Sequence, residues 1–419
     1  MKRWLTRIFL DYFRHWKDTL KWVLFSILSG IAIGLVGTAF YFCMDLVTEI
    51  RFEHPWLICL LPAAGLLITG AYQLLKDEND SGTNLILSAI HSGDNIPLRM
   101  APLIFFSTLI THLFGGSAGR EGAALQLGGS IGSGIGTLFR FSDKEQKVLI
   151  MCGMSAAFSA VFGTPLAAAI FAMEVVSVGI MHYSALLPCV ISSLIAHQIA
   201  VAFGATAESF AISNIPSVAI VPALEIALLA VLCALASILF CILLHQTGHL
   251  FQKLFTNKYL RIVIGGLIII ALTALVGNQN YNGTGMNVIQ QCFQGSTPPL
   301  AFLLKMVFTA ITLAVGYKGG EIVPSFFIGA TLGCFFGTVA GISPSLCAAV
   351  GMGAVFCGVT NCPITSLLIC FELFGFEGMP YYLLAIAISY VVSGYYGLYQ
   401  SQKIVYSKYK NAYINRKTL

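Results

Sequence analysis

The residues of this sequence that are most able to do chemistry are two glutamates on glycine-rich turns. Glu121 lies in the segment GGSAGREGAALQLGG, and Glu321 lies in the segment GYKGGEIVPSFFIGATLG. Each turn opens an apolar run that predicts a helix. A helix N-terminus favours an anion, because its first N–H groups are unpaired and its dipole end is positive. A glutamate carboxylate can itself be that anion, and protonation can release it. The pattern therefore predicts a gate that couples proton movement to anion movement.

Two structural alternatives compete with this gate. Glu121 can form an internal ion pair with Arg120, although adjacent residues of a helix do not face each other. Glu321 can merely cap a helix. Two further glutamates in apolar runs, Glu174 and Glu372, follow prolines at the same spacing of nine residues. We expect this second pair to have matching structural roles.

The composition identifies lipid as the solvent around these residues. Of the 419 residues, 57% are hydrophobic and 10% are charged, whereas a soluble domain carries roughly 25% charged residues. A membrane span needs about 20 mostly apolar residues. The runs long enough to span are Trp22–Val47, Trp56–Leu75, Leu186–Phe203, Val221–Leu244 and Ile262–Val276. Broken helices are tolerated at membrane depth only where the backbone lines a cavity buried in protein. The apolar runs that glycine or proline interrupts are Ala101–Phe114, Gly122–Leu138 and Ser325–Ala340.

An internal duplication divides the chain into two similar halves. The segment GMSAAFSAVFGTP at 153–165 aligns with GMGAVFCGVTNCP at 351–363, and six of the thirteen positions are identical. The alignment predicts one membrane half at 22–205 and a second at 222–400, joined by a linker at 206–221. Repeats of this kind indicate a transporter or channel whose substrate site lies near the membrane midplane, between the halves. A duplicated scaffold without a pathway is the alternative.

Basic residues are concentrated at both ends of the chain. Residues 1–21 predict an amphipathic surface helix with Trp4, Ile8 and Phe9 on its apolar face. Residues 401–419 form a short basic tail. By the positive-inside rule both ends are cytoplasmic, so the number of membrane crossings is even. Because a membrane surface explains these charges, we expect no nucleic acid among the partners.

The sequence contains no pattern typical of a cofactor site, a metal site or an enzyme. The 12 cysteines are scattered without a Cys-x-x-Cys pair. His245 and His249 lack the intervening glutamate of a zinc protease. No paired aspartates and no His-Glu metal motif lie in the apolar zone. We therefore expect a membrane transporter without cofactor or metal, and not an enzyme.

The motif segments together resemble the CLC family of chloride and fluoride transporters. The run around Glu121 resembles the signature Gly-Arg/Lys-Glu-Gly, whose glutamate is the external gate, and 316–333 resembles the second-half signature. The segment SQKIVYSKY at 401–409 resembles the stretch with the anion-coordinating tyrosine, which maps to Tyr406. The resemblance covers nearly the whole chain. It implies an all-α polytopic membrane protein with two inverted-topology repeat halves, whose broken helices meet at a midplane anion site. It also implies a homodimer with one pathway per subunit.

Two motifs resemble the fluoride-exporting branch more than the chloride-handling branch. After the double glycine stand Glu321, Ile322 and Val323, where fluoride exporters have Gly-Gly-Glu-Val-Thr-Pro. The place of the first anion motif holds Thr83 and Asn84, without the proline of the chloride pattern Gly-Ser-Gly-Ile-Pro. Both differences predict the fluoride branch.

Two valines bear on the mechanism and on selectivity. Val175 stands where chloride exchangers have an internal proton-relay glutamate, which suits either chloride channels or fluoride exchangers. Val323 stands where fluoride exporters have threonine, so one hydroxyl donor is lost. Thr83 or Asn84 can replace that donor.

The sequence therefore predicts a proton-coupled fluoride exporter, that is, a fluoride/proton antiporter, in the cell membrane of a bacterium. A chloride/proton antiporter or a passive chloride channel of the same family is the alternative. The expected partners are fluoride or chloride ions, protons and the lipid bilayer. We expect Glu121 and Glu321 to act in gating and proton coupling. The residues expected to bind the anion are Thr83, Asn84, Gly122, Ile322, Val323 and Tyr406.

Overall fold

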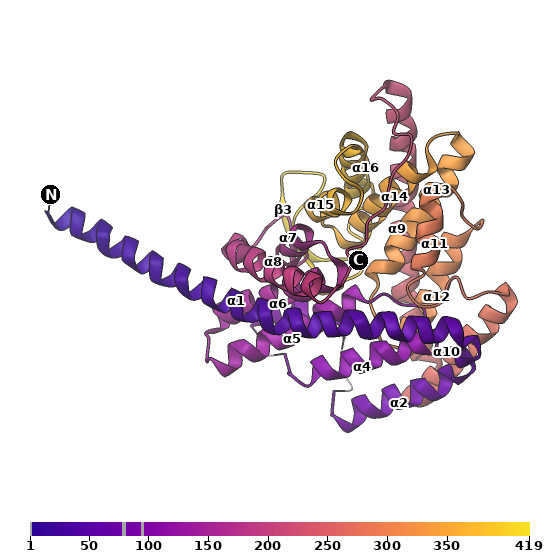
Figure 1. Ribbon diagram of the computed structural model, residues 1–419, viewed down its shortest axis with the longest axis horizontal. Helices are drawn as coiled ribbons and strands as arrows, with labels where there is room; N and C mark the ends of the chain where they lie inside the picture. Colours follow the sequence, from indigo (N-terminus) through magenta and orange to yellow (C-terminus); the bar gives the residue numbers. More distant parts are fainter. Residues whose placement is uncertain (1, 78–80, 94–95) are drawn as a thin grey trace.

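The computed structural model describes residues 2–77, 81–93 and 96–419, with side chains from Trp16 onward. This part of the chain is mostly helical (Figure 1). The first half contains α1 (Lys2–Glu53), η1 (Pro55–Leu60), α2 (Leu61–Leu74), α3 (Thr83–Ser92), α4 (Met100–Leu113), α5 (Glu121–Leu138), α6 (Asp143–Phe162), α7 (Pro165–Glu174), β1 (Ser177–Val178), η2 (Tyr183–Ala185) and α8 (Leu186–Ala202). The second half contains α9 (Ile220–Leu254), α10 (Lys258–Val276), α11 (Met286–Phe293), α12 (Ala301–Val315), α13 (Ile322–Ala340), α14 (Pro344–Thr360), α15 (Pro363–Phe374), α16 (Met379–Val392), β2 (Lys403–Tyr406) and β3 (Tyr413–Lys417).

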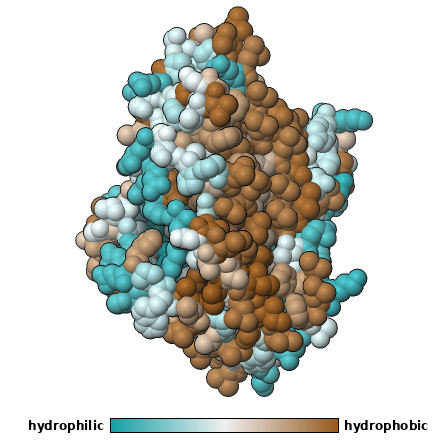
Figure 2. All heavy atoms as spheres, turned by 90° about the vertical axis from the view of Figure 1, so that its right-hand side faces the viewer, coloured by the Kyte–Doolittle hydropathy of each residue, from teal (hydrophilic) through white to brown (hydrophobic). Residues whose placement is uncertain are grey.

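Long apolar helices confirm the prediction of an all-α polytopic membrane protein. Within the described residues, the segments long and apolar enough to span are Trp16–Glu53, Pro55–Leu74, Tyr183–Ala202, Ile220–Leu254, Lys258–Val276 and Ile322–Ala340. Figure 2 shows a broad hydrophobic area on one face, with hydrophilic residues along its margins. Shorter apolar helices occur in matching places of the two halves, such as α4 with α12 and α7 with α15. These are the broken helices that a buried pathway requires.

The first helix, α1, is longer than the first predicted span. It continues without a break through residue 21, where the surface helix was expected to end, and its N-terminal part projects beyond the rest of the molecule (Figure 1). The apolar face predicted from Trp4, Ile8 and Phe9 lies outside the residues whose side chains are described. The second half begins with α9 at Ile220, two residues before the predicted boundary.

Glycines explain why the two duplicated segments are similar. A Cβ on Gly128 of α5 would lie 2.0 Å from the carbonyl oxygen of Gly153 on α6. In the second half, a Cβ on Gly329 of α13 would lie 2.3 Å from the carbonyl oxygen of Gly351 on α14. Small residues let membrane helices approach closely and pack through their backbones. The repeated glycines therefore hold together the helix pair that starts at each glycine-rich turn.

Glu174 and Glu372 have reciprocal structural roles, as the repeat predicted. Glu372, near the end of α15, accepts hydrogen bonds from the backbone N–H groups of Leu166 and Ala167 at the start of α7, both at 2.9 Å. Glu174, at the end of α7, does the same at the start of α15, at 3.1 and 2.8 Å. Each carboxylate therefore satisfies N–H groups that the first turn of a helix leaves unpaired. The two caps fasten the halves to each other.

The C-terminal tail is docked on the helical body. β2 pairs in parallel with β1, and β3 pairs antiparallel with β2. The buried side chain of Gln402 donates to the carbonyl oxygens of Val175 and Thr360, at 2.9 and 2.8 Å. The tail is therefore tied to the ends of one helix from each half, α7 and α14.

Candidate functional site

The two glycine-rich turns, one from each half, meet inside the protein. Gly119 and Gly320 form an isolated antiparallel bridge, in which the N–H of each donates to the carbonyl of the other at 2.7 Å. A Cβ on Gly320 would lie 2.5 Å from the backbone nitrogen of Gly122. A side chain at Gly320 would therefore force the turns apart. Both motifs thus form one unit. Glu321 follows its bridge residue directly, and Glu121 follows Gly119 after one intervening residue, Arg120.

Glu121 is the first residue of α5, and its side chain is fully buried. Its Oε2 accepts a hydrogen bond from the backbone N–H of Arg120 at 3.2 Å. Its Oε1 lies 3.4 Å from Nε of Arg120 but accepts no hydrogen bond among the described residues. The expectation that adjacent residues would not face each other is therefore wrong here. Arg120 lies before the helix, at its N-cap, where side-chain directions do not follow helical spacing.

Glu321 occupies the N-cap of α13, but its side chain makes no capping hydrogen bond. Its Oε2 is buried and has no hydrogen-bond partner among the described residues. A Cβ on Gly122 would lie 3.2 Å from this oxygen. The carboxyl therefore lies against the start of α5, in the opposite half. The turns thus bring Glu121 and Glu321 to the same glycine bridge. Glu321 stands at the N-cap position of α13, but its side chain does not cap the helix.

The starts of α5 and α13 provide backbone donors beside these carboxyls. The first N–H groups of a helix have no partner within it, and Gly122, Ile322 and Val323 lie in such first turns. A Cβ on Gly119 would lie 3.1 Å from the backbone nitrogen of Val323, so the two helix starts flank one bridge. The side chains of Ile322 and Val323 are apolar and fully buried. These three residues can therefore contact an anion only through their backbone.

The first anion motif lies at the start of α3, and its two polar residues have different surroundings. Thr83 is buried, and its Oγ1 accepts a 3.4 Å hydrogen bond from Nε2 of Gln126 on α5. Asn84 instead accepts a 2.9 Å hydrogen bond from the backbone N–H of Ser401 in the tail. The structure therefore brings Thr83 to the helix that carries Glu121 and uses Asn84 to hold the tail.

The structure separates the predicted tyrosine from the site and places another tyrosine there. Tyr406 lies on β2, is 43% exposed and packs its ring against Tyr413, at 5.9 Å between centroids. Tyr399 is 1% exposed, and its hydroxyl has no hydrogen-bond partner among the described residues. It lies close enough to Glu321 and Glu121 to interact electrostatically with both. This placement argues against Tyr406 as an anion ligand and in favour of Tyr399.

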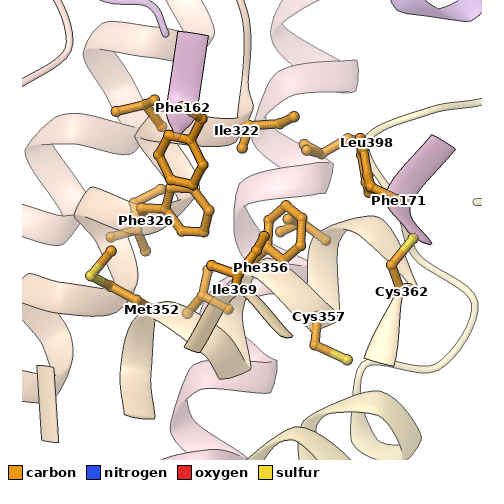
Figure 3. Close-up of a cluster of buried hydrophobic side chains, with 14 of the residues drawn as sticks. Phe162, Phe171, Ile322, Phe326, Met352, Phe356, Cys357, Cys362, Ile369 and Leu398 are labelled. Carbon is orange, nitrogen blue, oxygen red and sulfur yellow. The ribbon is translucent and has the colours of Figure 1, made fainter. Parts of the chain in front are cut away.

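Apolar side chains exclude water from the region around α13. Phe162 and Phe326, one from each half, stack with their ring centroids 5.4 Å apart, and Phe356 lies 5.1 Å from Phe326. Figure 3 shows these rings in one cluster with Ile322 and Leu398. In such a low-dielectric environment, hydrogen bonds and charges act far more strongly than in water. The donors at the helix starts are therefore well placed to replace the hydration shell of a small anion.

Sequence reasoning did not identify Gln126 or Tyr399 as site residues. Gln126 is buried, and its Oε1 has no hydrogen-bond partner among the described residues. A signal for it exists, because it is a lone amide in the glycine-rich apolar run that begins at Glu121. The signal for Tyr399 is weaker. It lies seven residues before Tyr406 in a chain end with several tyrosines, so only burial distinguishes it.

Comparisons with known sequences agree with this architecture. A protein-family model described as voltage gated chloride channel matches residues 64–394. The chain is 38% identical to a chloride/fluoride channel protein of Pseudomonas syringae pv. tomato, covering 93% of this chain and 88% of that protein. It is 27% identical to the H(+)/Cl(-) exchange transporter ClcA of Vibrio cholerae serotype O1, covering 83% of this chain and 81% of that one.

Solved structures show the same fold. A CLC-type fluoride/proton antiporter superposes with a TM-score of 0.88 at 32% identity, covering 92% of this chain and 98% of that chain. A slow cyanobacterial Cl-/H+ antiporter superposes with a TM-score of 0.76 at 20% identity, covering 89% and 94%. The matches support the predicted arrangement of two inverted halves. Since the family model spans most of the chain, this protein belongs to the voltage gated chloride channel family, the CLC family of membrane anion transporters and channels.

Proposed function

We propose that this CLC protein is a fluoride/proton antiporter that exports fluoride. The observation that carries the proposal is the meeting of Glu121 and Glu321, each with a buried carboxyl oxygen, at one glycine bridge between the halves. Each has an oxygen without a hydrogen-bond partner among the described residues. An ionised carboxylate only accepts hydrogen bonds, whereas a protonated carboxyl also donates one. Two carboxyls beside an anion site can therefore donate to the anion only when they take up protons.

The proposed cycle follows from these donors. Fluoride holds its water tightly, so the site has to replace that water with strong, fixed donors. Backbone N–H groups at the starts of α5 and α13, the hydroxyl of Tyr399 and a protonated Glu321 supply them. Ionised Glu121 competes with fluoride for the helix starts, and protonation of Glu121 frees the site. Fluoride movement and proton movement thus become one event, with proton flow opposite to fluoride flow.

Val175 supports a route for protons that differs from that of chloride exchangers. Its side chain is fully buried and cannot carry a proton, and its carbonyl holds Gln402 of the tail. In this proposal, Glu321 carries the proton that an internal relay glutamate would otherwise carry. The 32% identity to a solved fluoride/proton antiporter supports fluoride/proton exchange as the activity of the whole protein.

Chloride/proton exchange is the second candidate, and Val323 favours it. Its fully buried apolar side chain offers no hydroxyl, so the donor count beside Glu321 is lower than in the fluoride motif. Fewer donors suit a larger anion that gives up its water more readily. In the fluoride proposal the hydroxyl groups of Thr83 and Tyr399 offset this loss.

Proteoliposomes loaded with fluoride or chloride, followed with an ion electrode and a pH dye, test the proposal. We expect a fluoride gradient to drive protons in the opposite direction, and chloride to move more slowly. Glu321→Ala should lower fluoride turnover by about 100-fold or more, since it removes a proton carrier, while the melting temperature stays unchanged. Equal fluoride and chloride fluxes in the wild type would defeat the selectivity claim. Normal fluoride transport by Glu321→Ala would defeat the role of that carboxyl.

The proposal includes a topology and an assembly. We infer that both termini are cytoplasmic, that the protein lies in the cell membrane, and that two copies form a homodimer with one pathway each. The membrane halves at 22–205 and 222–400, the linker at 206–221 and the segments 1–21 and 401–419 remain the proposed division of the chain.

A further inference from the structure

Arg120, directly before the gate glutamate, binds three carboxylates from three different elements. Its Nη1 lies 3.2 Å from Asp45 on α1, its Nη2 lies 3.3 Å from Glu208, and its Nε lies 3.4 Å from Glu121. Glu208 belongs to the segment between α8 and α9, which connects the two halves. The guanidinium also lies over the ring of Tyr41, 5.0 Å from its centroid. The guanidinium of Arg120 thus lies within ion-pair distance of Glu121 and of two further acids, Asp45 and Glu208.

The charge balance of this cluster favours an extra proton. One guanidinium faces three carboxyls, and a guanidinium does not give up its own proton. When several carboxylates share one site, their mutual repulsion favours protonation of one of the carboxylates. The charged groups that face Glu208 among the described residues are Arg120, Asp45 and Glu121. Burial raises the pKa of Glu208, and Asp45 adds to this effect, while Arg120 opposes it.

Exposure decreases in order along the cluster. The side chain of Asp45 is 44% exposed, that of Glu208 is 22% exposed, and that of Glu121 is fully buried. Oε1 of Glu121, on the side of Arg120, accepts no hydrogen bond among the described residues. The three carboxyls around Arg120 therefore range from a surface acid to a buried one, and Oε1 of the buried one faces Arg120 without a hydrogen bond among the described residues.

The segment that carries Glu208 is fixed on both sides. The hydroxyl of Tyr41 contacts Thr206 at 3.4 Å, and the backbone N–H of Phe210 donates to the carbonyl of Leu373 at 3.0 Å. The ring of Phe210 stacks on Phe293, with centroids 4.6 Å apart. Glu208 is therefore held between two anchors and does not depend on Arg120 alone for its position.

We propose that Glu208, held by Arg120, is the residue that delivers protons from the outer solution to Glu121, with Asp45 at the entrance. In each turnover the O–H bond of the Glu208 carboxyl breaks and a new O–H bond forms on the Glu121 carboxylate. A solvent proton that enters past Asp45 then restores Glu208. The inference rests on the proposed proton coupling and on cytoplasmic termini, which place the end of α1 and Asp45 on the outer side.

The test compares Glu208→Gln with wild type in proteoliposomes while the external pH is varied. Fluoride and chloride gradients are used in turn, so that the relay is tested whichever anion is carried. At neutral to alkaline external pH we expect proton-coupled exchange to fall by about 100-fold, the low end of what a positioned proton donor contributes. At acidic external pH the rate should recover, because solvent protons then reach Glu121 directly.

Matched variants separate the relay from a structural role. Glu208→Asp keeps a carboxyl and should restore most of the rate, whereas Glu49→Gln, an exposed acid one turn after Asp45, should behave as wild type. Fluoride binding measured by calorimetry should be unchanged in Glu208→Gln. Two results in Glu208→Gln would overturn the relay: a wild-type pH profile, or an equal loss of exchange rate at all pH values. Both results would leave the proposed function intact. Absence of any proton movement in the wild type overturns both.

Discussion

At the scale of residues, the informative feature of this protein is a set of buried polar atoms that make no hydrogen bond within the described part of the chain. Oε1 of Glu121, Oε2 of Glu321 and the hydroxyl of Tyr399 make no hydrogen bond among the described residues. Buried polar atoms in folded proteins nearly always have a partner. Since Tyr399 interacts electrostatically with both glutamates, we infer that a transported anion or proton is the partner of these groups.

The Tyr399 hydroxyl gives a direct test of this view. We expect Tyr399→Phe to weaken fluoride binding about tenfold, since one lost hydrogen bond costs about 1–1.5 kcal/mol. Isothermal titration with fluoride measures the change. Tyr406→Phe is the matched control, because the side chain of Tyr406 is 43% exposed and its ring packs against Tyr413 on β3. A larger effect from Tyr406→Phe than from Tyr399→Phe would restore the assignment based on sequence resemblance.

Glu121 is the residue that should couple protons to the anion. Glu121→Gln keeps the shape of the protonated side chain but cannot release a proton. We therefore expect anion-driven proton movement to disappear, to below about a hundredth of the wild-type rate. The pH dye in proteoliposomes reports this directly. Proton movement that persists under an anion gradient in Glu121→Gln would contradict its role as the gate.

At the scale of elements, the two halves are joined by reciprocal contacts that obey the repeat. The turns before α5 and α13 form the Gly119–Gly320 bridge, and the ends of α7 and α15 cap each other's starts. Helices that end inside a membrane protein leave N–H groups that cannot bond to water. The broken helices are therefore stable only because each half supplies hydrogen-bond acceptors for unpaired N–H groups of the other half.

We expect loss of a reciprocal cap to lower the stability of the protein and to leave its transport activity unchanged. Glu372→Gln weakens two hydrogen bonds to a charged acceptor, each worth about 1.5–3 kcal/mol. We expect a lower melting temperature in detergent and normal fluoride turnover per folded molecule. Glu174→Gln should behave alike, and Glu377→Gln, at an exposed position after α15, serves as the control. Lost turnover at unchanged stability would instead place Glu372 in the pathway.

At the scale of the whole molecule, apolar side chains remain exposed on helices from both halves that are related by the repeat. They include Leu166 on α7, Leu187 on α8, Ile364 on α15 and Leu383 on α16, each between 46% and 50% exposed. Lipid can cover such a surface, and so can a second copy of the chain. The proposed homodimer predicts a mass of twice the 45.1 kDa of one chain in native mass spectrometry from mild detergent. A single-chain mass at all detergent concentrations would contradict it.

The sequence by itself determined the membrane class, the two halves and both glutamates of the site. Hydrophobic run length, a duplicated glycine pattern and acids in apolar surroundings are local signals, and each has a physical cause that does not depend on the rest of the chain. The same reasoning predicted matching structural roles for Glu174 and Glu372. It also placed the residues after Glu121 and Glu321 at the starts of helices, where the structure has them.

Only the tertiary structure decided which polar groups reach the site from distant parts of the chain. Tyr399 and Tyr406 are separated by seven residues, and the burial of one and exposure of the other follow from how the tail packs against α7 and α14. Glu208 carries no sequence signal, because its contact with Arg120 spans 88 residues and depends on how the connecting segment packs against Tyr41 of α1. Such contacts join elements that are distant in sequence, so no local pattern of residue types records them.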